Sequence, residues 1–400
     1  MHEFRRDRMT WIAYAMLAWF AYLQAAPGMI VPHLRDELHL SYSAGGLHVA
    51  GFAAGSLLAG FIAGPLERGY GRKPLFWCSA VAMGAGAALL TAGRVEAVTL
   101  AAMLVMGIGG GLLLITVQAL LADRHGELRT IALTEANVAA SAAYVVLIGG
   151  LALAAALSLG WRAALLAVLL LPPAGYLFAR REPLTAPPPP PRDHGTLPAR
   201  FWVAAAMVFF TTGAEWCVTG WGASFVRDAA GVSTDTGVTL MGGYFAGVLA
   251  GRIAGSALAR RYAAYRLLAG ALALTALGFA VLWPATSPAV ALAGLTIVGL
   301  GLGNLFPLGL SVTVGLAPDH AQLASARIAL VTSSAVLLAP LTVGALADAT
   351  SITAALAVVP AALALAAVGL TFVTRAQGAR PLAAQAPTSA RRPGAPGSVR

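Results

Sequence analysis

The stretch Gly107-Ile-Gly-Gly-Gly-Leu-Leu113 returns 192 residues later as Gly299-Leu-Gly-Leu-Gly-Asn-Leu305. The same shift aligns other landmark residues: Arg35-Asp36 with Arg227-Asp228, Ser41 with Ser233, Gly51 and Gly55 with Gly243 and Gly247, and Leu66 and Arg68 with Leu258 and Arg260. A single register that holds over such distances indicates that one structural unit occurs twice in the chain.

The composition indicates what kind of unit is repeated. Of the 400 residues, 58% are hydrophobic and only 10% are charged, and the mean hydropathy is +0.78. A soluble domain of this length needs far more polar surface. Several apolar runs reach the roughly 20 residues with which a helix crosses a hydrocarbon core about 30 Å thick. The sequence lacks the alternating pattern of an outer-membrane barrel, so we predict an all-α integral membrane protein.

We expect twelve transmembrane helices, six in each copy of the unit. Their approximate ranges are 9–32, 43–63, 74–93, 96–121, 131–157, 161–179, 201–226, 234–258, 264–283, 288–314, 324–346 and 352–373. The chain then divides into an N-terminal half (1–179), a Pro-rich cytoplasmic linker (180–200), a C-terminal half (201–374) and a disordered cytoplasmic tail (375–400). The first range is too long for the apolar part of a signal peptide.

The distribution of Lys and Arg predicts the orientation of these helices. With both termini in the cytoplasm, the inner segments hold 20 of the 26 cations, and the outer loops hold only Arg35, Arg94, Arg162 and Arg227. We therefore expect a multi-pass protein of the plasma (cytoplasmic) membrane, with the lipid bilayer as its surroundings. The net charge of +10 follows from this bias, and it gives no support for a nucleic-acid partner.

The loop after the second range reads Gly64-Pro-Leu-Glu-Arg-Gly-Tyr-Gly-Arg-Lys73. It resembles the signature loop of the major facilitator superfamily (MFS), G-x-L-x-D-R-x-G-R-K, and the residues that carry or border the resemblance are Gly64, Glu67, Arg68, Gly71, Arg72 and Lys73. The resemblance implies the MFS fold, two pseudo-symmetric six-helix halves, in a monomeric transporter. In that family the loop locks against the opposite half and biases the inward–outward equilibrium.

Two departures from the family affect this interpretation. Arg68 occupies the acidic position of the loop, with Glu67 one residue earlier, so an ion pair with the other half is expected to be rearranged. Met103 stands where many proton-coupled drug exporters have an arginine, and the fifth span lacks the Gly-Pro-rich pattern of drug/proton antiporters. These absences weaken an interpretation as a drug exporter.

Ionisable groups inside a bilayer are costly, so each is a candidate functional residue. Of the 16 acidic residues only Glu135 and Glu215 lie well inside predicted spans. Glu215 is near the middle of the seventh span, and Thr211, Thr212 and Thr219 share its helical face. Such a carboxyl could accept a proton or bind a polar substrate; alternatively, it could remain protonated and hydrogen-bond a neighbouring helix.

Neutral side chains supply further candidates for substrate binding. Trp216 borders Glu215, and Trp19 and Tyr22 lie on the pseudo-equivalent first helix, where aromatic rings could hold a sugar or an organic cation or could simply pack. Gln118 and Asn304 lie on the fourth and tenth helices, which line the cavity in the family. Both could hydrogen-bond a substrate or another helix.

Three charged residues suggest gating. Glu135 and Arg327 occupy equivalent positions in the two halves, near the cytoplasmic ends of their helices. They could form an inner gate that breaks when the cavity opens inward, or they could be a static pair or snorkel separately to the interface. Arg252 could pair with a carboxylate or with helix-end carbonyls.

The sequence predicts no cofactor, metal site or enzyme activity. It contains no G-x-x-x-x-G-K-[ST] phosphate loop, and the spacings of His33, His39 and His48 match no metal motif. We therefore predict a secondary active transporter that moves a small organic solute by alternating access, with protons as the coupling ion. Uptake of a polar solute competes with efflux of a drug or metabolite by an antiporter. A membrane sensor or enzyme on a transporter-like scaffold is the non-transport alternative.

Overall fold

The computed structural model describes residues 4–182, 184 and 195–378, and all regular elements in these ranges are helices. The α-helices are α1 (Arg8–Leu38), α2 (Tyr42–Tyr70), α3 (Arg72–Ala92), α4 (Glu96–His125), α5 (Arg129–Ala156), α6 (Trp161–Leu166), α7 (Leu171–Ala179), α8 (Ala199–Ala230), α9 (Thr234–Leu258), α10 (Ala264–Leu282), α11 (Pro288–Val314), α12 (Ala321–Ala349), α13 (Ile352–Ala355) and α14 (Val358–Gly378). Two short 3-10 helices, η1 (Gly126–Leu128) and η2 (Pro318–His320), precede α5 and α12.

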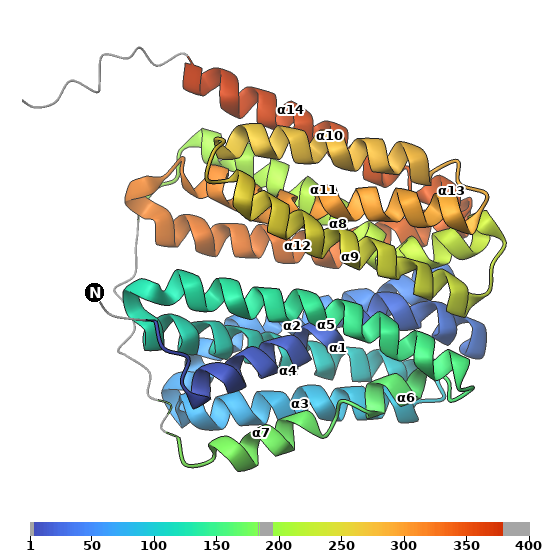
Figure 1. Cartoon of the computed structure of the whole chain (residues 1–400), viewed down its shortest axis with the longest axis horizontal. Helices are drawn as coiled ribbons and strands as arrows, with labels where there is room; N and C mark the ends of the chain where they lie inside the picture. Colours follow the sequence, from blue (N-terminus) through green and yellow to red (C-terminus); the bar gives the residue numbers. More distant parts are fainter. Residues whose placement is uncertain (1–3, 183, 185–194, 379–400) are drawn as a thin grey trace, which may run out of the picture.

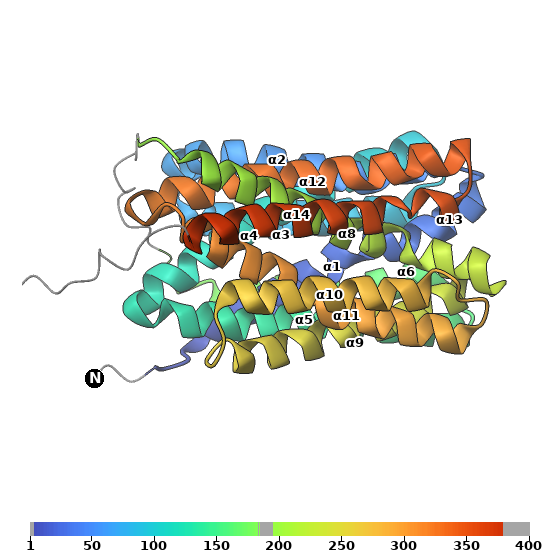
Figure 2. The ribbon, with the colours of Figure 1, turned by 90° about the horizontal axis from the view of Figure 1, so that it is seen from above.

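The helices form two bodies that lie side by side. Figure 1 shows α1–α7 as one body and α8–α14 as the other, and Figure 2 shows the same bundle from above. The beginning of α1 and the end of α14 lie at the same end of the bundle (Figure 1). We call this the inner end, because the positive-inside rule predicts that it faces the cytoplasm, and we call the opposite end the outer end.

Eleven helical stretches among the described residues are long and apolar enough to cross a membrane. The longest, Glu96–Ala156, has 61 residues and comprises α4, η1 and α5. A single helix of that length would extend about 90 Å, roughly three times the hydrocarbon thickness. Two crossings are therefore expected in this stretch, and the total of twelve remains a prediction.

The duplicated glycines serve the same packing contacts in both bodies. A Cβ atom on Gly107 of α4 would lie 2.1 Å from the Phe52 carbonyl oxygen of α2, and one on Gly299 of α11 would lie 2.1 Å from that of Tyr244 in α9. Phe52 and Tyr244 are themselves 192 residues apart. Only glycine allows helix backbones to approach this closely, so each body is built around the same tight crossing.

The sixth and the twelfth predicted spans fall on stretches of membrane-spanning length, Trp161–Ala179 and Ile352–Thr374, and the structure shows that each stretch consists of two helices. Residues 161–179 form α6 and α7, and residues 352–373 form α13 and most of α14. Pro172 and Pro360 lie in the first turn of the second piece. Proline lacks an amide hydrogen and is well tolerated in the first turn of a helix, so both prolines suit the start of the second piece.

The predicted linker and tail are described only in part. Residues 183 and 185–194 of the predicted linker (180–200) and residues 379–400 of the predicted tail (375–400) lie outside the described residues. Within the described ranges, α8 begins at Ala199, inside the predicted linker, and α14 continues to Gly378. The four residues 375–378 are therefore helical, which corrects the predicted start of the disordered tail.

Candidate transport site

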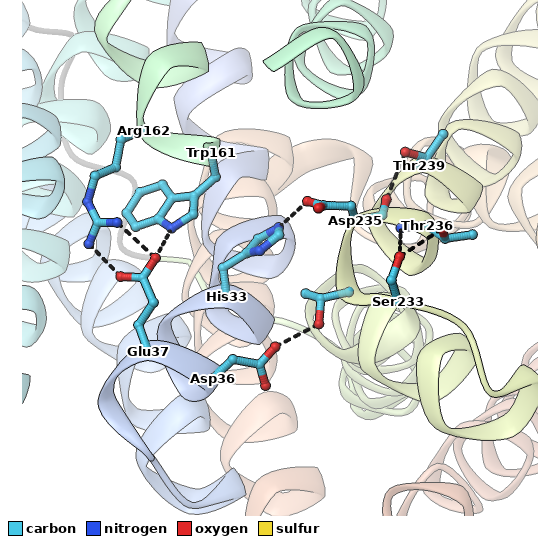
Figure 3. Close-up of polar contacts among 10 residues, drawn as sticks. His33, Asp36, Glu37, Trp161, Arg162, Ser233, Asp235, Thr236 and Thr239 are labelled. Carbon is cyan, nitrogen blue, oxygen red and sulfur yellow. Dashed lines mark hydrogen bonds and ion pairs between the residues drawn. The ribbon is translucent and has the colours of Figure 1, made fainter. Parts of the chain in front are cut away.

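The two halves are joined at the outer end by polar contacts around Asp36 of α1. Its carboxylate accepts hydrogen bonds from Arg227 Nη1 at 3.0 Å and from Thr234 Oγ1 at 2.7 Å, both in the C-terminal half. His33, one turn earlier on α1, faces Asp235 with 3.7 Å between Nε2 and Oδ1 (Figure 3). These contacts link the end of α1 to the end of α8 and the start of α9.

A second contact of this kind joins α12 to α2. Asp348, near the end of α12, accepts hydrogen bonds from the backbone amides of Tyr42 at 2.7 Å and Ser43 at 2.8 Å. These amides belong to the first turn of α2 and have no partner within their own helix. The Tyr42 hydroxyl also donates to Asp228 Oδ2 at 2.7 Å. A carboxylate of the C-terminal half thus caps a helix of the N-terminal half.

Glu37 anchors the outer end of α1 within its own half. It accepts hydrogen bonds from Trp161 Nε1 at 2.8 Å and from both terminal nitrogens of Arg162 (Figure 3). Neighbouring carboxylates on α1 therefore have different functions: Asp36 faces the other half, whereas Glu37 fixes α1 to α6.

The interface between α5 and α9 changes along its length. Toward the outer end, Ile148 of α5 and Phe245 of α9 are buried, and a Cβ on Gly242 would lie 3.3 Å from Ile148. Toward the inner end, Asn137 and Ser256 continue the same helical faces but are exposed. The halves therefore touch near the outer end and part toward the inner end.

Arg252 of α9 lies where this parting begins. Its Nη1 donates to Ser141 Oγ of α5 across the interface at 2.8 Å, and its Nε donates to the Gly303 carbonyl at 3.4 Å. The Ser141 hydroxyl in turn donates a hydrogen bond to the Asn137 carbonyl at 2.9 Å. The guanidinium is therefore held by neutral groups, one of which belongs to the other half.

The charge of Arg252 also acts on Glu215 of α8, although no ion pair joins the two among the described residues. Glu215 is half-buried at the middle of its helix, and the described residues give it no hydrogen-bond partner. The predicted carboxyl thus lies near a cation without being paired to it.

Neutral polar side chains lie near Glu215 and Arg252, whose charges act on Tyr144 and Tyr244. The Tyr144 hydroxyl of α5 donates to Gln24 Oε1 of α1 at 3.2 Å, and the hydroxyls of Thr219 and Tyr244 lie 3.0 Å apart. We call Gln24, Ser141, Tyr144, Glu215, Thr219, Tyr244 and Arg252 the central cluster; it draws on both halves. Gln24, Ser141, Tyr144 and Tyr244 are not among the residues predicted from the sequence.

The other predicted binding residues lie apart from this cluster or use their polar groups in packing. Trp19 and Tyr22 donate to the carbonyls of Val168 and Ala164, inside the N-terminal half. Asn304 donates to the Gly251 carbonyl at 2.7 Å and so fixes α11 to α9. These hydrogen bonds are those of helix packing.

Three further predicted residues have no hydrogen-bond partner in the described ranges. Gln118 is exposed on α4, and Trp216 is half-buried and packs against the core. Thr212 is buried, and its hydroxyl oxygen has no partner among the described residues.

The signature loop is tied to the N-terminal half. Arg72 Nε donates to Glu67 Oε1, and its Nη1 donates to Asp123 Oδ2 at the end of α4, each at 2.6 Å. Lys73 donates to the Arg180 carbonyl. Gly71 joins α2 to α3 with φ of +84°, a value that favours glycine, whereas Gly64 and Arg68 belong to the last turns of α2.

The predicted pair of Glu135 and Arg327 is not formed in this structure. Glu135 accepts hydrogen bonds from Arg6 Nε at 2.8 Å and from the Tyr14 hydroxyl at 3.0 Å, both in its own half. Arg327 is exposed, and the described residues provide no partner for it. An inner gate made by these two residues would be open here, so the gating hypothesis stays a prediction.

The sequence profile of the Major Facilitator Superfamily matches residues 10–242, more than half of the chain. The chain is a member of this family. The match, the all-helical halves and the repeated glycine crossings agree with the resemblance carried by the signature loop, and the protein is accordingly a transmembrane transporter.

Solved transporter structures share the fold of this facilitator. A bacterial homologue of the human lysosomal transporter Spinster, inward-facing and occupied, aligns with a TM-score of 0.75 at 14% identity, over 94% of this chain and 98% of that one. A D-xylose-proton symporter gives 0.73 at 15% identity, over 92% and 96%, and a nucleoside transporter gives 0.70 at 11%, over 92% and 98%. Identities this low show the fold alone. No protein with a curated description matches the sequence.

Proposed function

We propose that this facilitator is a proton-coupled secondary transporter of a small organic solute, and that Glu215 takes up the coupling proton. The observation that carries the proposal is the position of Glu215, at mid-helix in the central cluster and without a partner in the described ranges. An ionisable group in a membrane span is costly and normally serves transport. Glu135, by contrast, is neutralised by Arg6.

The arrangement of the halves supports alternating access. In the state seen here the outer contacts are made and the halves part toward the inner end, so the central cluster exchanges solute and proton with the cytoplasmic side. Outward opening requires the bonds of Asp36, Asp348 and Tyr42 to the opposite half to break. A carboxyl between the halves can exchange its proton with either side as the halves rock. The D-xylose-proton symporter with this fold is, by its description, proton-coupled.

The test is substrate-driven proton movement in proteoliposomes that contain a pH-sensitive dye. Wild-type protein and Glu215→Gln are challenged with sugars, organic acids, amino acids and lipophilic cations. We expect a proton signal for at least one compound, reduced to the background of protein-free liposomes in Glu215→Gln, because the amide cannot carry a proton. The sign of the signal separates symport from antiport.

The matched control is Glu135→Gln, which removes the other carboxyl that the sequence places inside a span. Since Glu135 is engaged by Arg6 and Tyr14, this variant should keep the proton signal. Undiminished proton-driven accumulation by Glu215→Gln would refute the assignment of the proton to Glu215.

A further inference from the structure

We propose that the transported solute is a small organic anion and that Arg252 binds its carboxylate. The inference rests on the proposed transport function and assigns the chemical class of the solute. The hydrogen bonds and the position of the Arg252 guanidinium carry this inference.

Arg252 is a permanent positive charge in a membrane-spanning helix. The guanidinium does not lose its proton in proteins, and it offers five N–H donors in a rigid fork. The described partners of Arg252 are a serine hydroxyl and a backbone carbonyl, and both are neutral. Its charge is therefore unmatched by direct contact, and most of its donors remain available to a ligand.

The position of Arg252 is suited to a solute that enters from the inner end. Ser256, one turn closer to the inner end on the same face of α9, is exposed, as is Asn137 on the facing side of α5. Arg252 itself is half-buried. It therefore lies at the boundary between the closed and the open part of the interface, and a ligand bound there would contact both halves.

Within the central cluster, Arg252 selects for the charge of the solute, and the neutral groups can hydrogen-bond to the rest of the solute. The charged or titratable groups around Glu215 are Arg252 and Tyr244 on α9 and Tyr144 on α5. Gln24 and Thr219 add an amide and a hydroxyl. A neutral solute would leave the guanidinium charge unmatched, and a cation would be repelled by it. A carboxylate fits the planar fork with two parallel hydrogen bonds.

Charge balance then links the anion to the proton. With Glu215 protonated, the cluster carries the single positive charge of Arg252 and attracts an anion. With Glu215 ionised, its carboxylate competes for that charge and the anion is released. Proton and anion therefore load together, the loaded cluster is electrically neutral, and the anion binds more tightly at lower pH.

The experiment measures the thermal unfolding midpoint of the purified full-length protein at constant ionic strength. The probes are pyruvate, glucuronate and benzoate, each paired with its uncharged amide: pyruvamide, glucuronamide and benzamide. We expect at least one carboxylate to raise the midpoint, more at about pH 5.5 than at about pH 8, while its amide does not. Binding to Arg252→Gln should weaken at least about tenfold, since a bidentate charge-assisted bond is lost.

Three variants make the result specific. Arg260→Gln removes an exposed cation just beyond α9 and should bind the carboxylate as the wild type does. Arg252→Lys keeps the charge without the fork and should bind with intermediate affinity, which also provides a test if Arg252→Gln does not fold. Glu215→Gln mimics the protonated state and should bind the carboxylate at both pH values.

Two outcomes would overturn the proposal: no carboxylate raises the midpoint, or an amide does so as well as its carboxylate. Proton flux separates this inference from the proposed function. Carboxylate binding that depends on Arg252, combined with proton flux that survives Glu215→Gln, would retain the anion site and refute the proton assignment. Proton flux that depends on Glu215 and is driven by neutral solutes would retain the proton assignment and refute the anion site.

Discussion

The outer and inner ends of the molecule use their charged residues differently. At the outer end, Asp36 and Asp348 each bind groups of the opposite half. At the inner end, the ion pairs of Arg6 with Glu135, Arg124 with Asp7 and Arg72 with Asp123 all lie within the N-terminal half. The outer contacts therefore depend on the conformational state, whereas the inner ones hold a single half together. From this we infer that the outer contacts are the barrier that outward opening has to overcome.

The largest expected effect comes from making an outer contact permanent. Cysteines in place of Asp36 and Thr234, whose oxygens lie 2.7 Å apart, should be joined by a short bis-methanethiosulfonate cross-linker, which attaches to each thiol through a disulfide. The background has Cys78 and Cys217 replaced by alanine. Because the halves could no longer separate at the outer end, transport into proteoliposomes should be almost abolished. A reductant should restore it.

The matched inner pair is Glu135→Cys with Arg327→Cys, treated in the same way. We expect it to cross-link much more slowly, since these residues do not meet in this state and Arg327 is exposed. Equal cross-linking rates for the inner and outer pairs would show that both ends are closed to the same extent. That result would contradict the inference that only the outer end is closed in this state.

A smaller effect is expected when the cap between α12 and α2 is removed. Asp348→Ala leaves the amides of Tyr42 and Ser43 without their acceptor, and loss of a helix cap costs about 1 kcal/mol. The equilibrium should shift toward outward-open states by about fivefold. The measurement is labelling of Val49→Cys by an impermeant maleimide added from outside, because Val49 is only 1% exposed in the closed state.

Asp319→Ala removes an exposed carboxylate near the inner end and is the control for Asp348→Ala. It should leave the labelling rate of Val49→Cys unchanged. A labelling rate that does not respond to Asp348→Ala would mean that this cap does not hold the outer end closed.

The smallest effect concerns Asp7, just before α1. Partial burial opposes its ionisation, but hydrogen bonds from Arg124 and Thr10 outweigh burial and lower the pKa of Asp7 below its ordinary value. Its stabilising contribution is therefore complete at neutral pH and is lost as the pH falls through the folded-state pKa. Asp7→Asn should lower the unfolding midpoint slightly at neutral pH and not in acid, and it should leave the labelling of Val49→Cys unchanged.

Much of the fold could be predicted because it follows from local apolar runs and from the repeat. The divided sixth and twelfth spans could not be placed as readily, since their mean hydropathy is high on both sides of the break. Pro172 and Pro360 were the available signals, but proline also occurs in continuous membrane helices. The residue type alone does not say which prolines interrupt a helix.

The site was predicted less completely, because which helix a side chain faces is a tertiary property. Trp19 and Tyr22 share one face of α1 and donate to the carbonyls of Val168, just after α6, and of Ala164, within α6. Gln24, two residues beyond Tyr22 and about 200° around the helix, instead accepts a hydrogen bond from Tyr144 of the central cluster. Gln24 could have been found as an amide in an apolar span. Glu135 is bound by Arg6, which is 129 residues away. No sequence spacing predicts this contact.

The repeat also records a divergence between the two copies. At the shift of 192 residues, Glu215 corresponds to Leu23, Arg252 to Gly60 and Asp348 to Ala156. The acidic and the basic residue of the central cluster, Glu215 and Arg252, thus belong to one copy, while the other supplies Gln24, Ser141 and Tyr144. A chimaera could combine this C-terminal half with the N-terminal half of a relative. It would keep Glu215 and Arg252 and change the neutral residues that contact the solute, so it is a starting point for altering solute selectivity.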